Sequence, residues 1–337
     1  MLQLKTDKYI MALGDVNPDM VLPYGESKAA LEAVARGESA PTDRSLRAKM
    51  YSGGSIGNTA SGLARLGMKT FFAGSAGKDA FSDFLTKEFE DDGVNCKYFA
   101  RKEGLFTCLV TAVVGADKER ILYCWPTSNA AHHQLLPEDL PDSAIDEIGW
   151  VHTSGIMLRE NPAAETIVNF LEKCRKKGVI VSFDLNLRLE AVGLSEEFAD
   201  RINRAVECAN VLFGSGVEEL MPLSGLDDPV AAAKSFVRDD RIVVSRSGKY
   251  GLSLYSTEEE FYCPTFDAKV VDTIGAGDAF NAGFISAAAL GKSLWDCATW
   301  GNGAATYALQ YVGARQCPKR DVLEQYIKDM PILHVKD

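Results

Sequence analysis

The sequence predicts an α/β protein with three layers, in which helices cover both faces of a mainly parallel central sheet and a small β lid projects from it. From about residue 150 onward, short apolar runs alternate with helical patterns. This β-α-β order is typical of parallel strands joined by helical crossovers. The strands are continuous apolar runs, as in a sheet that is buried on both faces. An alternating pattern at 106–125 interrupts the first third and indicates a β-hairpin.

The first third contains irregular connections between its expected elements. Residues 57–67 and 81–93 are predicted as helices, and each ends at a glycine. The hairpin at 106–125 turns at Gly-Ala-Asp-Lys, and its strands leave the main sheet. The other elements expected here are a strand that runs into a polar turn at 9–23, a helical stretch within 24–50, and a strand and loop at 69–77.

The remaining two thirds carry the regular α/β alternation. Residues 163–178 have apolar residues at helical spacing, a basic last turn and a final glycine, so they are predicted as a helix. Residues 195–209 are predicted as a helix with Ser195 as its N-cap and acids in its first turn. The other expected elements are strands at 150–156, 179–186, 210–215 and 241–247, and a helix at 228–239.

No internal repeat, low-complexity run or linker divides the chain. We therefore expect one domain over residues 1–337, with the lid formed by about 15–52 and 97–126. No run of apolar residues is long enough to span a membrane. The N-terminus lacks the pattern of a signal peptide. These features favour a cytoplasmic protein.

The charge of the chain excludes some classes of partner. It has 36 Lys and Arg against 47 Asp and Glu, which gives a formal charge of −11. Such a surface repels phosphate backbones and anionic lipids, so we expect no nucleic-acid partner and no membrane. A small anionic substrate is not excluded, because a pocket can be locally positive.

Neither the cysteines nor the histidines have the spacing of a metal site. The eight cysteines form no CxxC pair and are expected to be reduced, mostly buried thiols. No Cys/His spacing matches zinc. His132 and His133 stand in a polar stretch before Pro137, which predicts a solvated loop.

The segment 270–291 is the strongest candidate for a catalytic site. Two glycines, Gly275 and Gly277, precede a helix of small residues, and Asp278 falls in its first turn. The N–H groups at the start of a helix are unpaired and lie at the positive end of its dipole, so they can bind an anion. A carboxylate beside such a site could accept the proton of an attacking hydroxyl. The alternative is a structural turn in which Asp278 is only an N-terminal helix acid.

Four strings in this sequence resemble the ribokinase-like (PfkB) carbohydrate kinase family. The string DTIGAGDAFNAGF (272–284) resembles its C-terminal signature, and SGGSIGNTASGLARLG (52–67) resembles its Gly-Gly-x-x-x-Asn sugar segment. GDVNPDM (14–20) and the segment 74–95 match two further parts of the family pattern in the same order. The matches run from about residue 9 to about 320, so nearly the whole chain is covered. The resemblance implies the ribokinase-like three-layer fold, with ATP and Mg²⁺ as cofactors.

The resemblance also implies roles for residues around the acceptor. Asp278 matches the catalytic base, and Gly275, Ala276 and Gly277 match the anion hole for the transferred phosphoryl group. The sugar-binding positions of the family are matched by Asn17, Asp19, Gly53, Gly54 and Asn58. From the residues alone, Asp19 could instead be a turn residue, and Asn58 a helix N-cap or a core amide.

On the nucleotide side, Glu219 matches a glutamate that organises Mg²⁺ through water. The asparagine usual three residues earlier is replaced by Gly216, which leaves a metal or phosphate contact open. Arg246 stands where the family has threonine, and it is either a phosphate ligand or a surface charge. The remaining matches are Gly248, Gly251 and Asn302 for ATP, and Asp272 and Ile274 for an activating K⁺.

The substrate is less well defined by the sequence. FDLNLR (183–188) resembles a string found in fructokinase and 2-keto-3-deoxygluconate kinase relatives, where Arg188 would meet an acidic sugar or the γ-phosphate. Alternatively Arg188 pairs with Asp184. We expect a sugar kinase acting on a hexose, ketose or sugar acid, with ribose also open. A nucleoside kinase is the alternative, followed by a catalytically weak regulatory member. A homodimer through the lid is a further expectation.

Overall fold

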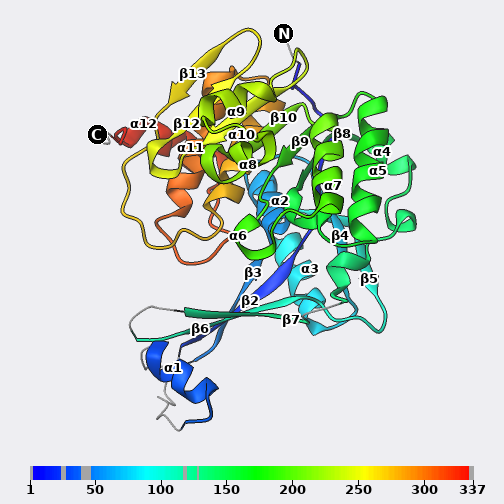
Figure 1. The fold of residues 1–337 in the computed structure, drawn as a ribbon, viewed down its shortest axis with the longest axis vertical. Coiled ribbons are helices and arrows are strands. Elements are labelled where there is room, and N and C mark those ends of the chain that lie inside the picture. Colours follow the sequence, from blue (N-terminus) through cyan, green and yellow to red (C-terminus); the bar gives the residue numbers. More distant parts are fainter. Residues whose placement is uncertain (1–2, 24–27, 39–46, 117–119, 127–128, 334–337) are drawn as a thin grey trace.

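The protein is described here from a computed structural model, which covers residues 3–23, 28–38, 47–116, 120–126 and 129–333. A nine-stranded central sheet dominates it, in the order β13-β12-β11-β10-β9-β8-β1-β4-β5 (Figure 1). The strands from β5 to β11 in this order are parallel, and β12 and β13 add an antiparallel edge. Their bounds are β1 (Tyr9–Leu13), β4 (Thr70–Gly77), β5 (Asn95–Lys102), β8 (Ile148–Ser154), β9 (Ile180–Asp184), β10 (Val211–Ser215), β11 (Ile242–Arg246), β12 (Leu252–Tyr255) and β13 (Glu260–Cys263). The predicted parallel sheet is confirmed, and the β12–β13 edge was not anticipated.

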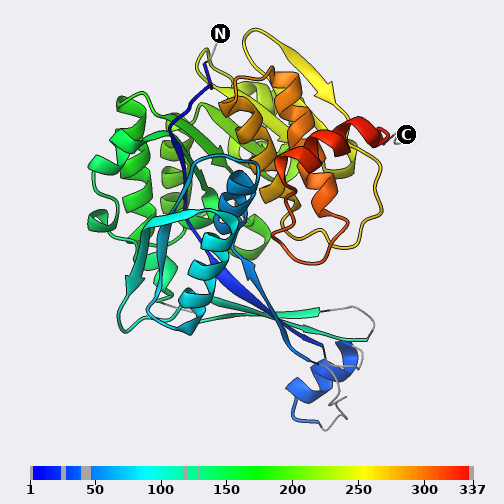
Figure 2. The same ribbon diagram turned by 180° about the vertical axis from the view of Figure 1, so that it is seen from behind.

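Helices cover both faces of this sheet, as the alternation predicts (Figures 1 and 2). The N-cap predicted at Ser195 is confirmed, because its side chain accepts a hydrogen bond from the Phe198 N–H at the start of α7 (Glu196–Cys208). One face carries α4 (Ser143–Glu147), α5 (Ala163–Lys176), α7 (Glu196–Cys208) and α9 (Pro229–Ser235). The other carries α2 (Ser55–Arg65), α3 (Ala80–Asp92), α10 (Ala276–Ala289) and α11 (Leu294–Ala308), with α12 (Arg320–Asp329) packed on α11. The short helices α6 (Leu189–Val192) and α8 (Met221–Ser224) lie in connections.

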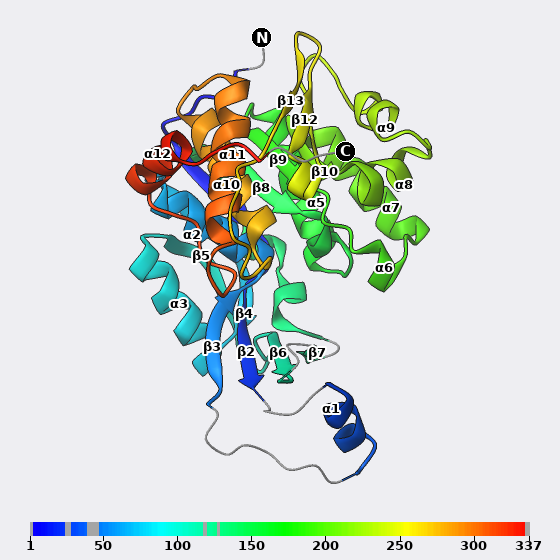
Figure 3. The same ribbon diagram turned by 90° about the vertical axis from the view of Figure 1, so that its left-hand side faces the viewer.

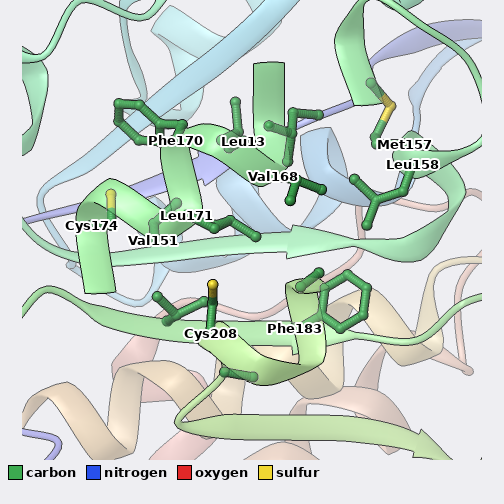
Figure 4. Close-up of a cluster of buried hydrophobic side chains, with 14 of the residues drawn as sticks. Leu13, Val151, Met157, Leu158, Val168, Phe170, Leu171, Cys174, Phe183 and Cys208 are labelled. Carbon is green, nitrogen blue, oxygen red and sulfur yellow. The ribbon is translucent and has the colours of Figure 1, made fainter. Parts of the chain in front are cut away.

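The core lies on both sides of the central sheet because neighbouring residues of each strand point to opposite faces. In β10, Leu212 packs against α5 and α7, while Phe213 packs against α10. Trp150 and Val151 of β8 divide in the same way, and all four side chains are fully buried. Figure 4 shows the α5 and α7 side of this core. Burial on both faces explains why these strands are continuous apolar runs.

The predicted lid is a separate four-stranded sheet in the order β3-β2-β6-β7 (Figure 3). Its strands are β2 (Asn17–Pro23), β3 (Lys49–Gly53), β6 (Leu109–Val114) and β7 (Arg120–Trp125), and α1 (Lys28–Ala35) lies beyond it. The hairpin prediction is confirmed, although its turn at 117–119 lies outside the described residues. The lid range of 97–126 is too long, because β5 pairs with β4 at the edge of the central sheet.

The eight cysteines are all free thiols, as expected, and five of them are buried. Cys124 of the lid is exposed. Within the described ranges, no helix combines the length and the apolar character needed to cross a membrane.

Candidate active site

A cavity of about 550 Å³ lies where the carboxyl ends of the parallel strands face the lid. Asp15 follows β1, Asp184 ends β9, Ser215 ends β10 and Arg246 ends β11, and all of them line it. Ligands of open α/β sheets bind at this edge, where loops and helix N-termini converge. Asn17 and Asp19 of the lid close the opposite side.

The glycine turn before α10 forms the floor of this cavity. Gly275 has a φ of 77°, in the left-handed region, and a Cβ there would lie 2.1 Å from the Ala314 carbonyl oxygen. Both the backbone angle and the close approach require glycine. Gly275, Gly277 and Asp278 line the cavity, whereas Ala276 is not among the lining residues. The first-turn N–H groups of α10 lack intrahelical acceptors, so this end of the helix suits an anion.

Asp278 is a buried carboxyl whose protonation is tuned by its neighbours. Its pKa is raised to about 7, with burial as the largest cause and the charges of Asp15 and Asp184 as smaller ones. Asn58 opposes this by donating a hydrogen bond from Nδ2 to Asp278 Oδ2 at 2.8 Å, and Arg246 also lowers the pKa. A carboxylate with a pKa near neutrality is well suited to accept and release a proton.

Arg315 fixes the orientation of the Asn58 amide. Its Nε donates to Asn58 Oδ1 at 3.3 Å, which leaves the Asn58 NH₂ group directed at Asp278. The buried Arg315 side chain also donates to the Gly53 carbonyl, and its Cζ lies over the Phe89 ring, 4.5 Å from the ring centroid. The contact between Arg315 and Asn58 spans 257 positions of the chain. No local pattern could indicate such a pair, and sequence reasoning missed Arg315.

The lid side of the cavity presents polar groups suited to sugar hydroxyls. Asn17 Nδ2 donates to Asp19 Oδ1 at 2.7 Å. The pKa of Asp19 is raised to about 6, because the effect of burial outweighs the hydrogen bond from Asn17 and the charge of Arg315, which lower it. A Cβ at Gly53 would lie 2.2 Å from Asp19 Oδ2, so this glycine makes room for the carboxyl group. Gly54 lines the cavity with a φ of 85°.

Asp184 and Arg246 form a buried ion pair on the other side of Asp278. Arg246 donates to Asp184 Oδ1 and to Asn281 Oδ1, and Asn281 Nδ2 donates to Asp184 Oδ2 at 2.7 Å. Burial alone would lower the pKa of Arg246, but Asp184 and Glu219 raise it. Arg246 is therefore neither a surface charge nor a free one. The alternative in which Arg188 pairs with Asp184 is not found, because Asp184 accepts hydrogen bonds from Arg246 and Asn281.

Glu219 and Arg188 both line the cavity, but they are held very differently. The two Glu219 oxygens accept from the Leu187 and Ser215 N–H groups at 2.9 and 2.7 Å. Burial and the nearby Asp184 raise the pKa of Glu219. Arg188 has a φ of 52° and makes no side-chain hydrogen bond with any residue of the described ranges, so its guanidinium is available to a ligand.

The glycine at position 216 has a steric reason. A Cβ there would lie 2.9 Å from Ser245 Oγ and 3.3 Å from Pro229 Cβ, so a larger residue would displace its neighbours. Ser215, the preceding residue, lines the cavity and accepts the Glu218 N–H as a helix cap. With glycine at position 216 in place of the usual asparagine, the polar side chain that this part of the loop presents to the cavity is that of Ser215.

Several predicted nucleotide and potassium residues lie outside the cavity lining. Gly248 and Gly251 shape the turn between β11 and β12 with φ values of 56° and 79°. The Asn302 side chain donates to the Pro264 carbonyl at 2.9 Å and holds that segment against α11. Asp272 accepts from the Ile274 and Gly313 N–H groups, both at 3.1 Å, and so ties two loops together. Of this set, only Ile274 lines the cavity.

Asp15 and Asn186 are lining residues that sequence reasoning did not select. Asp15 accepts from the Ser55 and Ile56 N–H groups, and burial raises its pKa. Asn186 donates to Ser55 Oγ at 3.0 Å. Both belong to strings that resemble family motifs, GDVNPDM and FDLNLR. Each lies two residues beyond the end of a buried parallel strand, and a polar residue at such a place is the sequence signal for them.

The histidine pair is not a solvated loop, contrary to the expectation. His132 and His133 lie in a 3₁₀ turn, Ala131–Gln134, and line a neighbouring cavity. Ser75 Oγ anchors the turn by donating to the Ala131 carbonyl at 2.7 Å. The polar composition of the segment does not indicate this burial, because the residues packed on the turn come from β4 and α5.

The oxygen-rich donor set of the cavity fits Mg²⁺ held through water. No three His, Cys, Asp or Glu side chains within the described ranges gather as a direct metal cage. Mg²⁺ usually keeps several waters and binds one or two carboxylates together with substrate phosphates. Glu219, whose oxygens already accept backbone N–H groups, has remaining lone pairs for such waters.

The fold and this site define a phosphotransferase of the α/β class with an alcohol acceptor, and comparisons with known proteins place it in a family. Residues 10–321 match the pattern of the pfkB family carbohydrate kinases, and the chain belongs to that family. A 5-dehydro-2-deoxygluconokinase of Geobacillus thermodenitrificans is 30% identical over 325 residues, covering 91% of this chain and 96% of the relative.

Solved structures agree with this assignment. The aminoimidazole riboside kinase of Salmonella enterica, complexed with aminoimidazole riboside and an ATP analogue, superposes with a TM-score of 0.77 at 25% identity and covers 95% of this chain and 100% of its own. A fructokinase double mutant of Vibrio cholerae, bound to fructose, ADP and potassium, gives 0.78 at 23% identity over 96% and 99% of the two chains. The ribokinase-like fold is confirmed.

Proposed function

We propose that this protein is a Mg²⁺- and ATP-dependent kinase that transfers the γ-phosphoryl group to a hydroxyl of a small sugar, with Asp278 as the general base. The observation that carries the proposal is the position of Asp278. It is a buried carboxyl at the N-terminus of α10, and the lid groups Asn17 and Asp19 face the same cavity.

In the proposed reaction, Asn17 and Asp19 hold the sugar by its hydroxyls, while Asp278 accepts the proton of the attacking hydroxyl. The oxygen of that hydroxyl forms a bond to the γ-phosphorus, and the bond to the β–γ bridging oxygen breaks, which releases ADP. The N–H groups at Gly275 to Gly277 bind the charge of the transferred group. Bound Mg²⁺ would neutralise phosphate charge, with Glu219 holding its waters.

Arg188 supplies a second source of positive charge for the phosphoryl path or for an acidic sugar. Its guanidinium has no partner within the described ranges and lines the cavity near Asp15, whose pKa it lowers. Arg246 has a different role in this proposal, because its ion pair with Asp184 keeps it in place beside Asp278. We also propose that K⁺ binds at the loops that Asp272 joins through the Ile274 and Gly313 N–H groups.

The substrate range that fits best is a hexose, ketose or sugar acid. The relative from Geobacillus acts, by its name, on 5-dehydro-2-deoxygluconate. An assay of ADP release across fructose, ribose, tagatose, 2-keto-3-deoxygluconate, 5-dehydro-2-deoxygluconate and adenosine, each with ATP and Mg²⁺, tests the proposal. Turnover of at least one sugar is expected, and inactivity with all of them contradicts it.

A riboside kinase is the second candidate, because a Salmonella typhimurium aminoimidazole riboside kinase is 32% identical over 236 residues. The lid aromatics do not favour it. Trp125 is next to Cys124 on β7, and Cys124 lines the neighbouring cavity, so Trp125 projects from the opposite face of the strand. Trp125 instead contacts Phe106 at a ring distance of 5.0 Å.

The outer face of the lid is the proposed contact of a homodimer. Met50, Phe106, Tyr123 and Trp125 each expose between 39% and 55% of their surface. Met50 lies on β3 and Tyr123 and Trp125 lie on β7, while Phe106 precedes β6 and packs on Trp125. A group of exposed apolar residues is typical of a protein interface. A second copy of the chain would cover them.

A further inference from the structure

A second cavity of about 360 Å³ opens beside the catalytic one. We call it the side chamber. It is bounded by the turn with His132 and His133, by Arg159 and Glu160, and by Cys124 of the lid. It shares four lining residues with the catalytic cavity, namely Asp15, Asn17, Val110 and Ile156. A molecule held at Asn17 can therefore reach both spaces.

Arg159 is a cation of the side chamber without a protein partner. Its guanidinium makes no hydrogen bond and no ion pair with any residue in the described parts of the chain, although its carbonyl accepts from Arg201 at 3.3 Å. Burial is the main cause that lowers the pKa of His132 and of His133, and the positive charge of Arg159 also lowers both. An unpaired arginine beside a cavity is a ready ligand for a carboxylate, which it can bind through two parallel hydrogen bonds.

The histidine pair adds hydrogen-bonding capacity that the protein itself does not use. The Nδ1 atoms of His132 and His133 are buried and have no hydrogen-bond partner among the described residues. Burial lowers the pKa of His132 to about 3, so this imidazole is neutral at physiological pH. A neutral imidazole can donate or accept one hydrogen bond at Nδ1.

One cation, Arg159, and two acids, Asp15 and Glu160, line the side chamber, and Asp15 already accepts the Ser55 and Ile56 N–H groups. The Arg159 end of the chamber can therefore match one negative charge at most. Arg159 is the one arginine or lysine among the residues that line it, and the imidazole of His132 is uncharged. Glu160 is an exposed acid that lies 3.6 Å from His133 Nε2 at the rim. A phosphate dianion would need more positive charge than this. The walls formed by Val110, Ile156 and Met157 are apolar and suit a short carbon chain.

We propose that the side chamber binds a carboxylate of the acceptor, with Arg159 as its ligand, so that the preferred substrates are sugar acids rather than neutral sugars. This inference rests on the proposed sugar kinase function and specifies its substrate class. The hydroxyl to be phosphorylated lies toward Asp278, Asn17 holds the middle of the molecule, and the carboxylate extends past Ile156 to Arg159.

The test compares each acid with its primary amide, which keeps the carbon skeleton and removes the charge. The probes are 2-keto-3-deoxygluconate, 5-dehydro-2-deoxygluconate and their amides. For wild type, we expect kcat/KM for one of the acids to exceed that for its amide by about 10- to 100-fold, the range of a hydrogen-bonded charge. In Arg159→Met, kcat/KM for the acid should fall by about the same 10- to 100-fold, so that the acid is no longer preferred over its amide.

Arg175→Met is the matched control. Arg175 lies on the surface of α5, pairs with Asp240 and lines neither cavity, so this variant should keep the wild-type preference. Arg159→Lys, which keeps the charge without the planar fork, should retain part of the preference even if Arg159→Met folds poorly. A wild-type enzyme that does not distinguish acid from amide, or an Arg159→Met variant that still does, overturns the proposal. Preference for a neutral riboside over both acids also overturns it.

Calorimetric titration of the same acids and amides in the absence of ATP separates this inference from the proposed function. Binding of an acid that is lost in Arg159→Met supports the side chamber even when no sugar is phosphorylated. In that case only the kinase proposal fails. Turnover of fructose without any binding of the acids leaves the kinase proposal standing and removes the side chamber as a carboxylate site.

Discussion

The central sheet and the lid sheet face each other across the cavity, but they are supported in opposite ways. All eight residues of β4 are buried, and helices pack on both faces of the central sheet. All six residues of β6 in the lid are only half-buried. Because the lid strands are less well packed than the strands of the central sheet, they depend mainly on the hydrogen bonds between neighbouring strands. In the proposed reaction, the groups that perform the chemistry therefore lie on the well-packed central sheet and its helices, which we call the rigid side. The lid sheet, which is less well packed, supplies contacts to the substrate.

The largest expected effect is on the rigid side. Asp278→Asn should lower kcat by about 10²- to 10⁴-fold, because the general base is lost. Sugar binding measured by calorimetry should remain, since Asn17 and Asp19 are unchanged. Asp296→Asn is the control, because Asp296 is also an acid in the first turn of a helix but lies outside the cavity lining. Near-normal turnover of Asp278→Asn would contradict the assignment.

A lid residue should affect binding more than turnover. Asp19→Ala removes a carboxyl group from the sugar side, and KM for the sugar should rise by about 10- to 100-fold, the range for a charged hydrogen bond. The value of kcat at saturation should fall much less. Steady-state kinetics with varied sugar measures both quantities. An unchanged KM would remove Asp19 from the site and weaken the division between the two layers.

The pH dependence of kcat/KM tests how the neighbours of Asp278 set its pKa. Because the pKa of Asp278 is raised to about 7, its ionised fraction falls as pH falls through that value, and kcat/KM should fall with it. Asn58→Ala removes a hydrogen bond that stabilises the ionised form. The acidic limb should therefore move to higher pH, and activity at pH 7 should drop by up to about tenfold. A limb that does not move would show that another group controls the profile.

The smallest effect on a single chain is expected at the outer face of the lid. Trp125→Ser should change the free energy of unfolding by less than about 1 kcal/mol, because the side chain is half-exposed. It should also weaken the proposed homodimer. Sedimentation over a range of protein concentrations measures this association. Identical sedimentation of wild type and variant would exclude the lid face as the contact.

Local patterns predicted most of the fold and part of the site. The glycine turn before Asp278, the helix N-cap at Ser195 and the lid hairpin are all properties of short segments. The Asp184–Arg246 ion pair and the Asn58–Asp278 hydrogen bond join residues 62 and 220 positions apart. Such contacts depend on strand order, which periodicity does not determine. The same limit explains the error at His132 and His133, whose cover comes from distant segments.

The gathering of acids around the catalytic cavity has a thermodynamic consequence for the fold. The pKa values of Asp15, Asp19, Glu219 and Asp278 are all raised, with burial as the largest cause. Above the ordinary pKa of a free carboxyl, the native state therefore holds more protons than the unfolded chain, and stability falls as pH rises toward about 7. The fold is thus weakened by the same ionisation that Asp278 needs in the proposed reaction, where it accepts a proton. The ionised acids therefore favour the proposed reaction but lower the stability of the fold. A ligand that brings positive charge to this cavity would stabilise the native state with its acids ionised.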